Sequence, residues 1–457
     1  MDPAAWLAVA CEIAMRETAL FAATGFLLLG VSDLAVDVIW IVQSLFGSRK
    51  FGASVATLPP PAAPGRFAIF VPAWQEGNVV GDMLGHARVA FGERDYVIYV
   101  GCYPNDPATI AAVRAAADLR IRLVIGTAPG PTTKADCLNR IWERMVEDEA
   151  ADGRRFKAVV LHDAEDVVHS AELRLFDALI ERFDLVQLPV LPLIDPRSRW
   201  IAGHYVDEFA EAHGKELVVR EALGAGLPSA GVGCAIARDA LAALAAVHGT
   251  PFDPDSLTED YELGLRLKTM GRSAAFVRLP VGPGRAAVAI REYFPPTLAA
   301  AVGQKARWMT GIALAGWDRL GWGGGIAERW MRLRDRQSVL AALILFTGYA
   351  ALVLWSGLFA AELLGGHEPR PLPPGLSLLL TINAGLLAWR LAMRFGFVAH
   401  AYGWREALRS VPRVIVGNMI AMMAARRAVI RYIAIRRTGF SAWDKTVHDF
   451  PQQLPAE

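Results

Sequence analysis

Long, nearly uncharged hydrophobic stretches lie toward both ends of the chain, and shorter ones recur between them. The long stretches cover residues 18–46, 338–364 and 376–399. Each is at least as long as the roughly 20 residues with which a helix crosses a bilayer. The pattern predicts one membrane-spanning helix before the central region and a hairpin of two such helices after it.

The short apolar runs of the central region alternate with helical stretches. They cover residues 67–71, 96–100, 121–125, 158–161 and 185–190. This alternation predicts βαβ units, and therefore an α/β fold with a mainly parallel sheet under helices. Ligands of such folds bind beyond the carboxyl ends of the strands, so the polar residues that follow these runs are the candidates for chemistry.

Proline-rich and basic segments separate these regions. Residues 58–65 form a stiff linker between an N-terminal segment, 1–57, and a central domain, 66–293. Residues 294–337 are expected to form helices at the membrane edge, before the hairpin at 338–399.

The C-terminal part, residues 400–457, is strongly basic. Several arginines, Arg413 among them, follow one another over residues 412–432 and predict an interfacial helix attracted to anionic lipid, with a cytoplasmic tail behind it. A fourth spanning helix is the alternative. The basic residues that flank the long stretches place the central domain in the cytoplasm.

Composition narrows the class of protein. Hydrophobic residues make up 54% of the chain and charged residues 20%, which argues against disorder and against a wholly soluble enzyme. A formal net charge of +1 gives no overall field for holding a nucleic acid, so we expect no nucleic-acid partner. The 4 cysteines are too widely spaced to indicate a zinc site or a disulfide framework.

Asp33 and Asp37 interrupt the first long stretch one helical turn apart. They share a helix face, which should point at other helices or at the headgroup region because charge is costly in lipid. Structural polar contacts and a functional role are both open for this pair.

Three carboxylates follow the run 158–161, within the segment His162-Asp-Ala-Glu-Asp. Asp163 and Glu165 are suited to one Mg²⁺ ion, which commonly takes one or two carboxylates plus substrate phosphates. The alternative is a solvated loop, or a helix start capped by Asp166.

Ser256-Leu-Thr-Glu-Asp precedes another helical run. Ser256 and Glu259 have the spacing of a capping box. Asp260 then stays available at the mouth of the sheet, where its carboxylate could accept a proton from a hydroxyl nucleophile.

Two further segments bear groups that suit phosphates and sugars. Gln304, Arg307 and Trp308 share one helix face, so Arg307 could pair with a diphosphate and Trp308 could stack on a sugar. An interfacial belt is the alternative for these three. Lys134 could approach a phosphate and Asp136 a nucleoside, although both are also ordinary residues for a helix start.

The order of these segments resembles the processive, membrane-embedded glycosyltransferases of family 2. The resemblance covers about residues 66–310 and rests on Val71-Pro-Ala-Trp-Gln-Glu, Lys-Ala-Asp, Asp-Ala-Glu-Asp, Thr-Glu-Asp and Gln-x-x-Arg-Trp. Within the family, the chain is most similar to members that act in bacteriophage adsorption. The resemblance implies a GT-A fold, an inner-membrane location in bacteria and a role in exopolysaccharide synthesis.

The resemblance also implies roles for individual residues. Asp163 and Glu165 would hold Mg²⁺ or Mn²⁺ on the diphosphate of a nucleotide sugar, and Asp260 would be the general base of an inverting transfer. The donor and the acceptor sugar would be bound by the remaining candidates: Glu76, Asp106, Lys134, Asp136, Gln304, Arg307 and Trp308.

The implied donor is a UDP-sugar, and the implied acceptor is a growing glycan. A transferase that loads a lipid phosphate, and a membrane scaffold without catalysis, are the alternatives. Three spanning helices are few for a polymer channel, so export would need a homo-oligomer or a partner pore.

Three features depart from the family pattern. Gly101-Cys-Tyr-Pro-Asn-Asp replaces the usual Asp-Asp-Gly-Ser turn, so the equivalent nucleobase contact could come from Asp106 or from no residue there. Glu165 replaces an aspartate. Larger members of the adsorption group have a C-terminal cyclic-di-GMP sensing domain, so here we expect that control to act through another protein, unless the chain is a shortened one.

Overall fold

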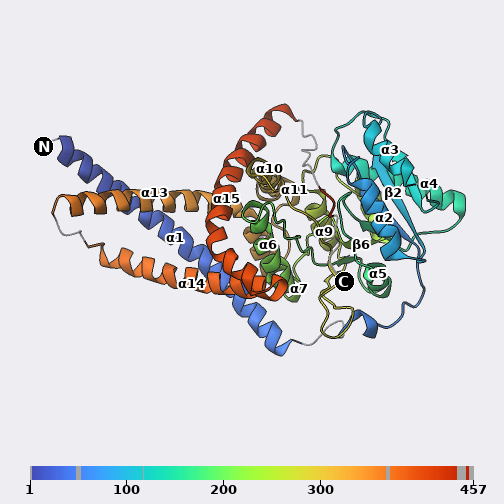
Figure 1. The fold of residues 1–457 in the computed structure, drawn as a ribbon, viewed down its shortest axis with the longest axis horizontal. Coiled ribbons are helices and arrows are strands. Elements are labelled where there is room, and N and C mark those ends of the chain that lie inside the picture. Colours follow the sequence, from blue (N-terminus) through green and yellow to red (C-terminus); the bar gives the residue numbers. More distant parts are fainter. Residues whose placement is uncertain (1–2, 48–52, 117, 367–370, 440–448, 452–457) are drawn as a thin grey trace.

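The computed structural model describes residues 3–47, 53–116, 118–366, 371–439 and 449–451. Three long helices extend to one side of the molecule, and a helix-covered sheet lies at the other side (Figure 1). A further long helix, α15, crosses the base of the three (Figure 1). The α/β part and the apolar helical part are therefore distinct regions joined by a helical layer.

Within the described residues, seven strands form one mixed sheet in the order β3-β2-β1-β4-β6-β5-β7. They are β1 (Phe67–Pro72), β2 (Tyr96–Cys102), β3 (Ile121–Ile125), β4 (Ala158–Leu161), β5 (Leu185–Gln187), β6 (Cys234–Ala237) and β7 (Ala274–Phe276). β1, β2, β3 and β4 run parallel, whereas β6 is antiparallel to both β4 and β5. The predicted strands are confirmed, with β5 ending at Gln187 rather than at residue 190.

Alternate residues of the strands enter two hydrophobic cores, one on each face of the sheet. Phe67, Ile69 and Val71 point into the first core, and Ala68 and Phe70 into the second. The first core is closed by α2 (Val80–Phe91), α3 (Pro107–Ala115) and α5 (Glu172–Leu179), and the second by α4 (Lys134–Asp152), α8 (Arg238–His248) and α9 (Glu259–Thr269). Burial on both faces explains why β1, β2 and β4 have continuous apolar sequences.

A layer of helices joins the sheet to the apolar helices, and it contains two π-helical segments, η2 and η3. The layer comprises α6 (Ile201–Glu211), η2 (Ala212–Glu216), α7 (Leu217–Ala222), α10 (Leu298–Trp308), η3 (Met309–Ala315), α11 (Gly316–Leu320) and α12 (Ile326–Arg336). A short 3₁₀ turn, η1 (Val55–Thr57), precedes the sheet. π-Helical turns are rare and concentrate at functional sites.

Three described helices are long and apolar enough to cross a membrane: α1 (Pro3–Phe46), α13 (Ser338–Leu364) and α14 (Pro374–Tyr402). α1 packs against both of the others. The first helix extends beyond the predicted spanning stretch 18–46, because α1 begins at Pro3. Polar residues such as Glu12 and Arg16 continue the helix beyond the apolar stretch, since backbone hydrogen bonding does not require an apolar side chain.

The predicted C-terminal helix is longer than expected. α15 (Trp404–Thr438) runs through Pro412, packs on α10, α13, α14 and α6, and is not among the described helices with spanning character. Arg413, expected to face lipid, is fully buried and pairs with Asp207 at 2.9 Å and Glu406 at 2.8 Å. Two carboxylates inside the protein therefore hold this arginine away from the lipid.

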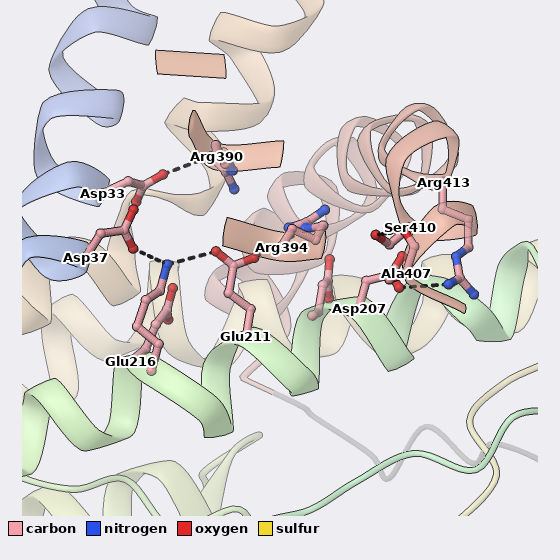
Figure 2. Close-up of polar contacts among 12 residues, drawn as sticks. Asp33, Asp37, Asp207, Glu211, Glu216, Arg390, Arg394, Ala407, Ser410 and Arg413 are labelled. Atoms are coloured by element: carbon pink, nitrogen blue, oxygen red, sulfur yellow. Dashed lines mark hydrogen bonds and ion pairs between the residues drawn. The ribbon is translucent and has the colours of Figure 1, made fainter. Parts of the chain in front are cut away.

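Asp33 and Asp37 both turn toward protein (Figure 2). Asp33 pairs with Arg390 at 2.9 Å and with Arg334 at 3.0 Å. Asp37 accepts hydrogen bonds from Lys215 Nζ at 2.6 Å and from the indole of Trp389 at 2.8 Å. These contacts tie α1 to η2, α12 and α14, so they join the first apolar helix to the helical layer.

Candidate active site

The loops that follow β1, β2 and β4 meet at one edge of the sheet, because these strands are parallel. A cavity of about 580 Å³ opens at this edge. All predicted site residues except Asp106 and Asp136 line it: Glu76, Lys134, Asp163, Glu165, Asp260, Gln304, Arg307 and Trp308. Residues from five separate segments of the sequence are thus gathered into one space.

Asp163 and Lys134 form an ion pair at the cavity wall. Lys134 begins α4, and its Nζ lies 2.5 Å from Asp163 Oδ1. Burial lowers the pKa of Lys134, but the carboxylates of Asp163, Glu259 and Asp260 outweigh it, so the pKa is raised. The ammonium is therefore held in its charged form beside these acids.

Asp260 lies in the first turn of α9, and its Oδ1 accepts a hydrogen bond from Tyr261 N at 2.7 Å. Burial raises the pKa of Asp260, while the nearby charge of Lys134 opposes that rise. Gly231 has a φ of +77°, and a Cβ there would come within 2.6 Å of Asp260 Oδ2. The absence of a side chain at Gly231 thus leaves room for the Asp260 carboxylate, which suits that carboxylate to accept a proton.

The capping box expected from Ser256 and Glu259 does not form. α9 begins at Glu259, with Thr258 as its N-cap residue, so Glu259 lies too early in the helix to reach back. Ser256 Oγ instead donates to Glu262 Oε1 at 2.6 Å and accepts from Thr258 N at 3.2 Å. The hydroxyl of Ser256 thus links the loop to the first turn of the helix.

Gln304, Arg307 and Trp308 come from α10, which ends at the cavity. Gln304 Oε1 is buried and has no hydrogen-bond partner among the described residues. A buried acceptor without a partner is costly, and a hydroxyl or amide donor on a bound ligand would satisfy it. Trp308 packs edge-on against Tyr205, with ring centroids 6.0 Å apart.

Asp106 lies outside the cavity lining. Its Oδ2 accepts from Gln75 N at 2.6 Å and its Oδ1 from Thr109 N at 3.3 Å, which caps α3. The Oγ1 of Thr109 then accepts from Glu76 N at 2.9 Å. Asp106 therefore fixes the loop that bears Glu76, and its nucleobase contact stays a prediction.

Asp136 is likewise engaged by neighbouring side chains. It accepts from Thr132 Oγ1 at 2.7 Å and from Arg140 Nε at 3.2 Å. Its side chain remains about a third exposed at the start of α4. Contact between Asp136 and a nucleoside stays a prediction.

Asp163 and Glu165 present hard oxygen donors to the cavity. No group of three or more His, Cys, Asp or Glu side chains within the described ranges forms a complete metal site. Two carboxylates fit a Mg²⁺ or Mn²⁺ ion that takes its other ligands from substrate phosphates and water. The donor set is therefore compatible with a metal that arrives with the nucleotide sugar.

His162, which directly precedes Asp163, belongs to a buried charge network that the sequence did not reveal. His162 Nδ1 is 2.7 Å from Asp166 Oδ2, and its Nε2 is 2.7 Å from Glu172 Oε1. Burial lowers the pKa of His162, but the two carboxylates outweigh it and raise the pKa to about 10. Asp166 also accepts from Asp163 N at 3.1 Å, so it braces the loop rather than capping α5, which starts at Glu172.

Two curated relatives match most of the chain. They are bacteriophage adsorption protein B of Escherichia coli strain K12 and bacteriophage N4 adsorption protein B of Escherichia coli O157:H7, each 37% identical over 453 residues. The matches cover 92% of this chain and 60% of each relative, so the chain spans about three fifths of their length.

A solved structure also resembles the whole chain. A mannosyltransferase from Pyrobaculum calidifontis in complex with GDP-Man and Mn²⁺ superposes with a TM-score of 0.54 at 17% identity, covering 91% of this chain and 99% of that one. The likeness confirms the GT-A fold. Residues 64–311, which contain the sheet and the cavity-lining part of α10, match the family described as glycosyltransferase like family 2. The chain therefore belongs to glycosyltransferase family 2, and this stretch is its glycosyltransferase domain.

Proposed function

We propose that this chain transfers a sugar from a nucleotide sugar to a saccharide acceptor, with inversion at the anomeric carbon. The supporting observation is that one cavity is lined by Asp163, Glu165 and Asp260 together with the cations Lys134 and Arg307. It therefore combines carboxylates for a metal, a carboxylate for a proton and two positive groups for a diphosphate.

The donor diphosphate is bound between Lys134 and Arg307. Arginine pairs with phosphate oxygens in a bidentate way, and lysine acts as a point charge. Both stabilise the negative charge that develops on the leaving nucleotide diphosphate. UDP is implied by the resemblance, while the mannosyltransferase relative was solved with GDP-Man, so both nucleotides belong in the test.

Asp163 and Glu165 are the residues that would hold a Mg²⁺ or Mn²⁺ ion. When bound, such an ion neutralises diphosphate charge. The positive charge of Lys134 offsets the negative charge of Asp163, since Lys134 Nζ lies 2.5 Å from Asp163 Oδ1. The ammonium thus orients this carboxylate at the cavity wall.

Asp260 accepts the proton of the acceptor hydroxyl as that oxygen attacks the anomeric carbon. The bond between this carbon and the diphosphate breaks at the same centre from the opposite side, which inverts its configuration. Trp308 offers an apolar face for the acceptor sugar, and Gln304 Oε1 a buried acceptor for one of its hydroxyls.

The product we propose is a polysaccharide made at the cytoplasmic face of a bacterial inner membrane, in an exopolysaccharide system that phage adsorption exploits. The names of the curated relatives and the apolar helices support this assignment. Export of a polymer would require a homo-oligomer or a partner pore, and cyclic-di-GMP control would act through a partner protein.

Nucleotide diphosphate release by purified protein tests the proposal. UDP-, GDP- and ADP-sugars are each supplied with Mg²⁺, Mn²⁺ or EDTA. We expect one donor to be turned over and EDTA to abolish the reaction. Asp163→Asn should lose metal stimulation, whereas the matched Asp239→Asn, on an exposed acid of α8, should keep it. Equal turnover in EDTA would contradict the metal assignment, and no turnover of any donor would favour the non-catalytic scaffold.

A further inference from the structure

The cavity that contains the candidate acids continues into the apolar helices. Its far wall is formed by α1, α13 and α14 through Leu29, Asp33, Val36, Ser338, Ala341 and Arg390. Ala341 lies one turn inside α13, at the end that adjoins the helical layer. One continuous space therefore joins Asp260 to the first turn of the apolar region.

The three apolar helices do not enclose a channel around this end. α1 packs against both α13 and α14, whereas α13 and α14 make no extensive contact with one another in the described part of the chain. In Figure 1, α1 runs diagonally across both of them. The outward side chains of α13 and α14 are apolar and exposed, for example Phe346, Val353 and Leu378. A polar polymer would find no closed, polar passage here, but a lipid could approach from the side.

The wall at this end mixes apolar and polar groups. Leu29, Val36 and Ala341 line the cavity together with Asp33. Asp33 pairs with Arg390, as Figure 2 shows, and also with Arg334. The side chain of Arg390 is 53% exposed despite this pair, so its remaining N–H groups can donate to a ligand. A ligand that fits has an apolar anchor and a head rich in hydroxyl groups.

Charges at this end are balanced rather than positive. Arg334 and Arg390 face Asp33, and Arg334 also lies 3.5 Å from Glu216. Carboxylates and guanidinium groups together suit the donors and acceptors of a sugar, whereas a free phosphate would compete with Asp33 for the arginines. The balance favours a saccharide head over a bare lipid phosphate.

We propose that the acceptor is a lipid-linked saccharide that enters from the membrane between α13 and α14. Its sugar hydroxyl reaches Asp260, and its lipid remains against α1. This inference rests on the proposed function and names the acceptor class of the same site. In the transfer, the acceptor oxygen bonds to the anomeric carbon, the nucleotide diphosphate leaves, and the hydroxyl proton passes to Asp260.

Transfer in lipid nanodiscs tests this acceptor. Protein is reconstituted in phosphatidylcholine alone or with added polar lipid extract from bacteria, and is given the radiolabelled donor that it turns over. We expect organic-extractable label to rise at least about tenfold with the extract. Label that appears only in water-soluble or polymeric product, at equal rates in both nanodiscs, would overturn the inference and favour direct polymer extension.

Failure of the inference is distinguishable from failure of the proposed function. Nucleotide diphosphate release without organic-extractable label overturns only the acceptor assignment. Absence of release from every donor, in both nanodiscs, counts against the proposed function itself.

A space-filling variant locates the acceptor site. Ala341→Trp places an indole at the membrane end of the cavity, and Ala360→Trp places one on an exposed position of the same helix. Ala341→Trp should lower lipid labelling about tenfold or more while the nucleotide Kd stays within about twofold; Ala360→Trp should match the parent. Unchanged labelling in Ala341→Trp would overturn the inference.

A second variant covers the case in which Ala341→Trp does not fold. Arg390→Gln removes the half-exposed guanidinium and should raise the KM for the lipid acceptor with little change in kcat. An unchanged KM in a folded Arg390→Gln protein would contradict the site.

Discussion

Acidic side chains are buried in two regions of the molecule, at the carboxyl edge of the sheet and where the apolar helices meet the helical layer. In the second region, the carboxylates form ion pairs with cationic side chains of the protein. Lys215 lies 2.6 Å from Asp37 and 2.9 Å from Glu211, and Arg394 lies 3.2 Å from Glu211. Figure 2 shows this chain of charges between α1 and α14. At the sheet edge, Asp163 and Asp260 instead line a cavity.

The difference separates charges that hold the protein together from charges that face a ligand. The side chains of Asp37 and Glu211 are 3% and 10% exposed, whereas that of Asp163 is 29% exposed. Asp163 and Asp260 also line the candidate cavity, whereas Asp37 and Glu211 do not. The predictions below test this contrast from the largest expected effect to the smallest.

Lys215→Met should destabilise the protein most. It leaves Asp37 and Glu211 buried without their shared cation, and breaking a buried pair in this way costs about 3–5 kcal/mol of unfolding free energy. Thermal unfolding in detergent measures the loss. Nucleotide binding by the folded fraction should be unchanged, and a loss of donor affinity with intact stability would contradict the structural role.

Lys134→Met should weaken donor binding rather than stability, the opposite of Lys215→Met. It removes a cation that lines the cavity, so the nucleotide-sugar Kd should rise about 10- to 100-fold, the value of one or two charge-assisted hydrogen bonds. Calorimetric titration with the donor measures this. An unchanged Kd would remove Lys134 from the donor site.

The pH profile of kcat/KM should report the buried base. Because Asp260 acts deprotonated and burial raises its pKa, activity should fall about tenfold per pH unit below that raised pKa. The charge of Lys134 lowers the pKa of Asp260, so the acid limb should move to higher pH in Lys134→Met. An acid limb at the same pH in both proteins would contradict the coupling.

Arg154→Ala should have the smallest effect. Arg154 pairs with Asp95 at 2.5 Å, but the side chains are 61% and 47% exposed. Exposed pairs contribute less than about 1 kcal/mol. The unfolding temperature of Arg154→Ala should therefore be close to that of the parent. A shift as large as that of Lys215→Met would show that the loss of stability depends on the ion pair itself and not on its burial.

The sheet and its carboxyl edge could be predicted from local pattern. β1, β2 and β4 are buried on both faces, so each leaves a continuous apolar run, and the acids that follow β4 stand out against it. β6 (Cys-Ala-Ile-Ala) and β7 (Ala-Ala-Phe) contain much alanine, which is depleted in strands, so neither was recognised as a strand.

Partners distant in sequence could not be predicted. Asp37 and Lys215 are 178 residues apart, and no local pattern links them. The same holds for Arg413 with Asp207. His162 was visible beside the acids, but its role depends on Glu172, which only the fold of the loop brings to it.

The rate of nucleotide diphosphate release by Asp260→Asn tests the central claim most directly. Asparagine keeps the size of the side chain but cannot accept the proton. Acceptor-dependent release should fall about 10²- to 10⁴-fold while the donor Kd and the unfolding temperature stay near those of the parent. Release at the parent rate in a folded Asp260→Asn protein would contradict that claim.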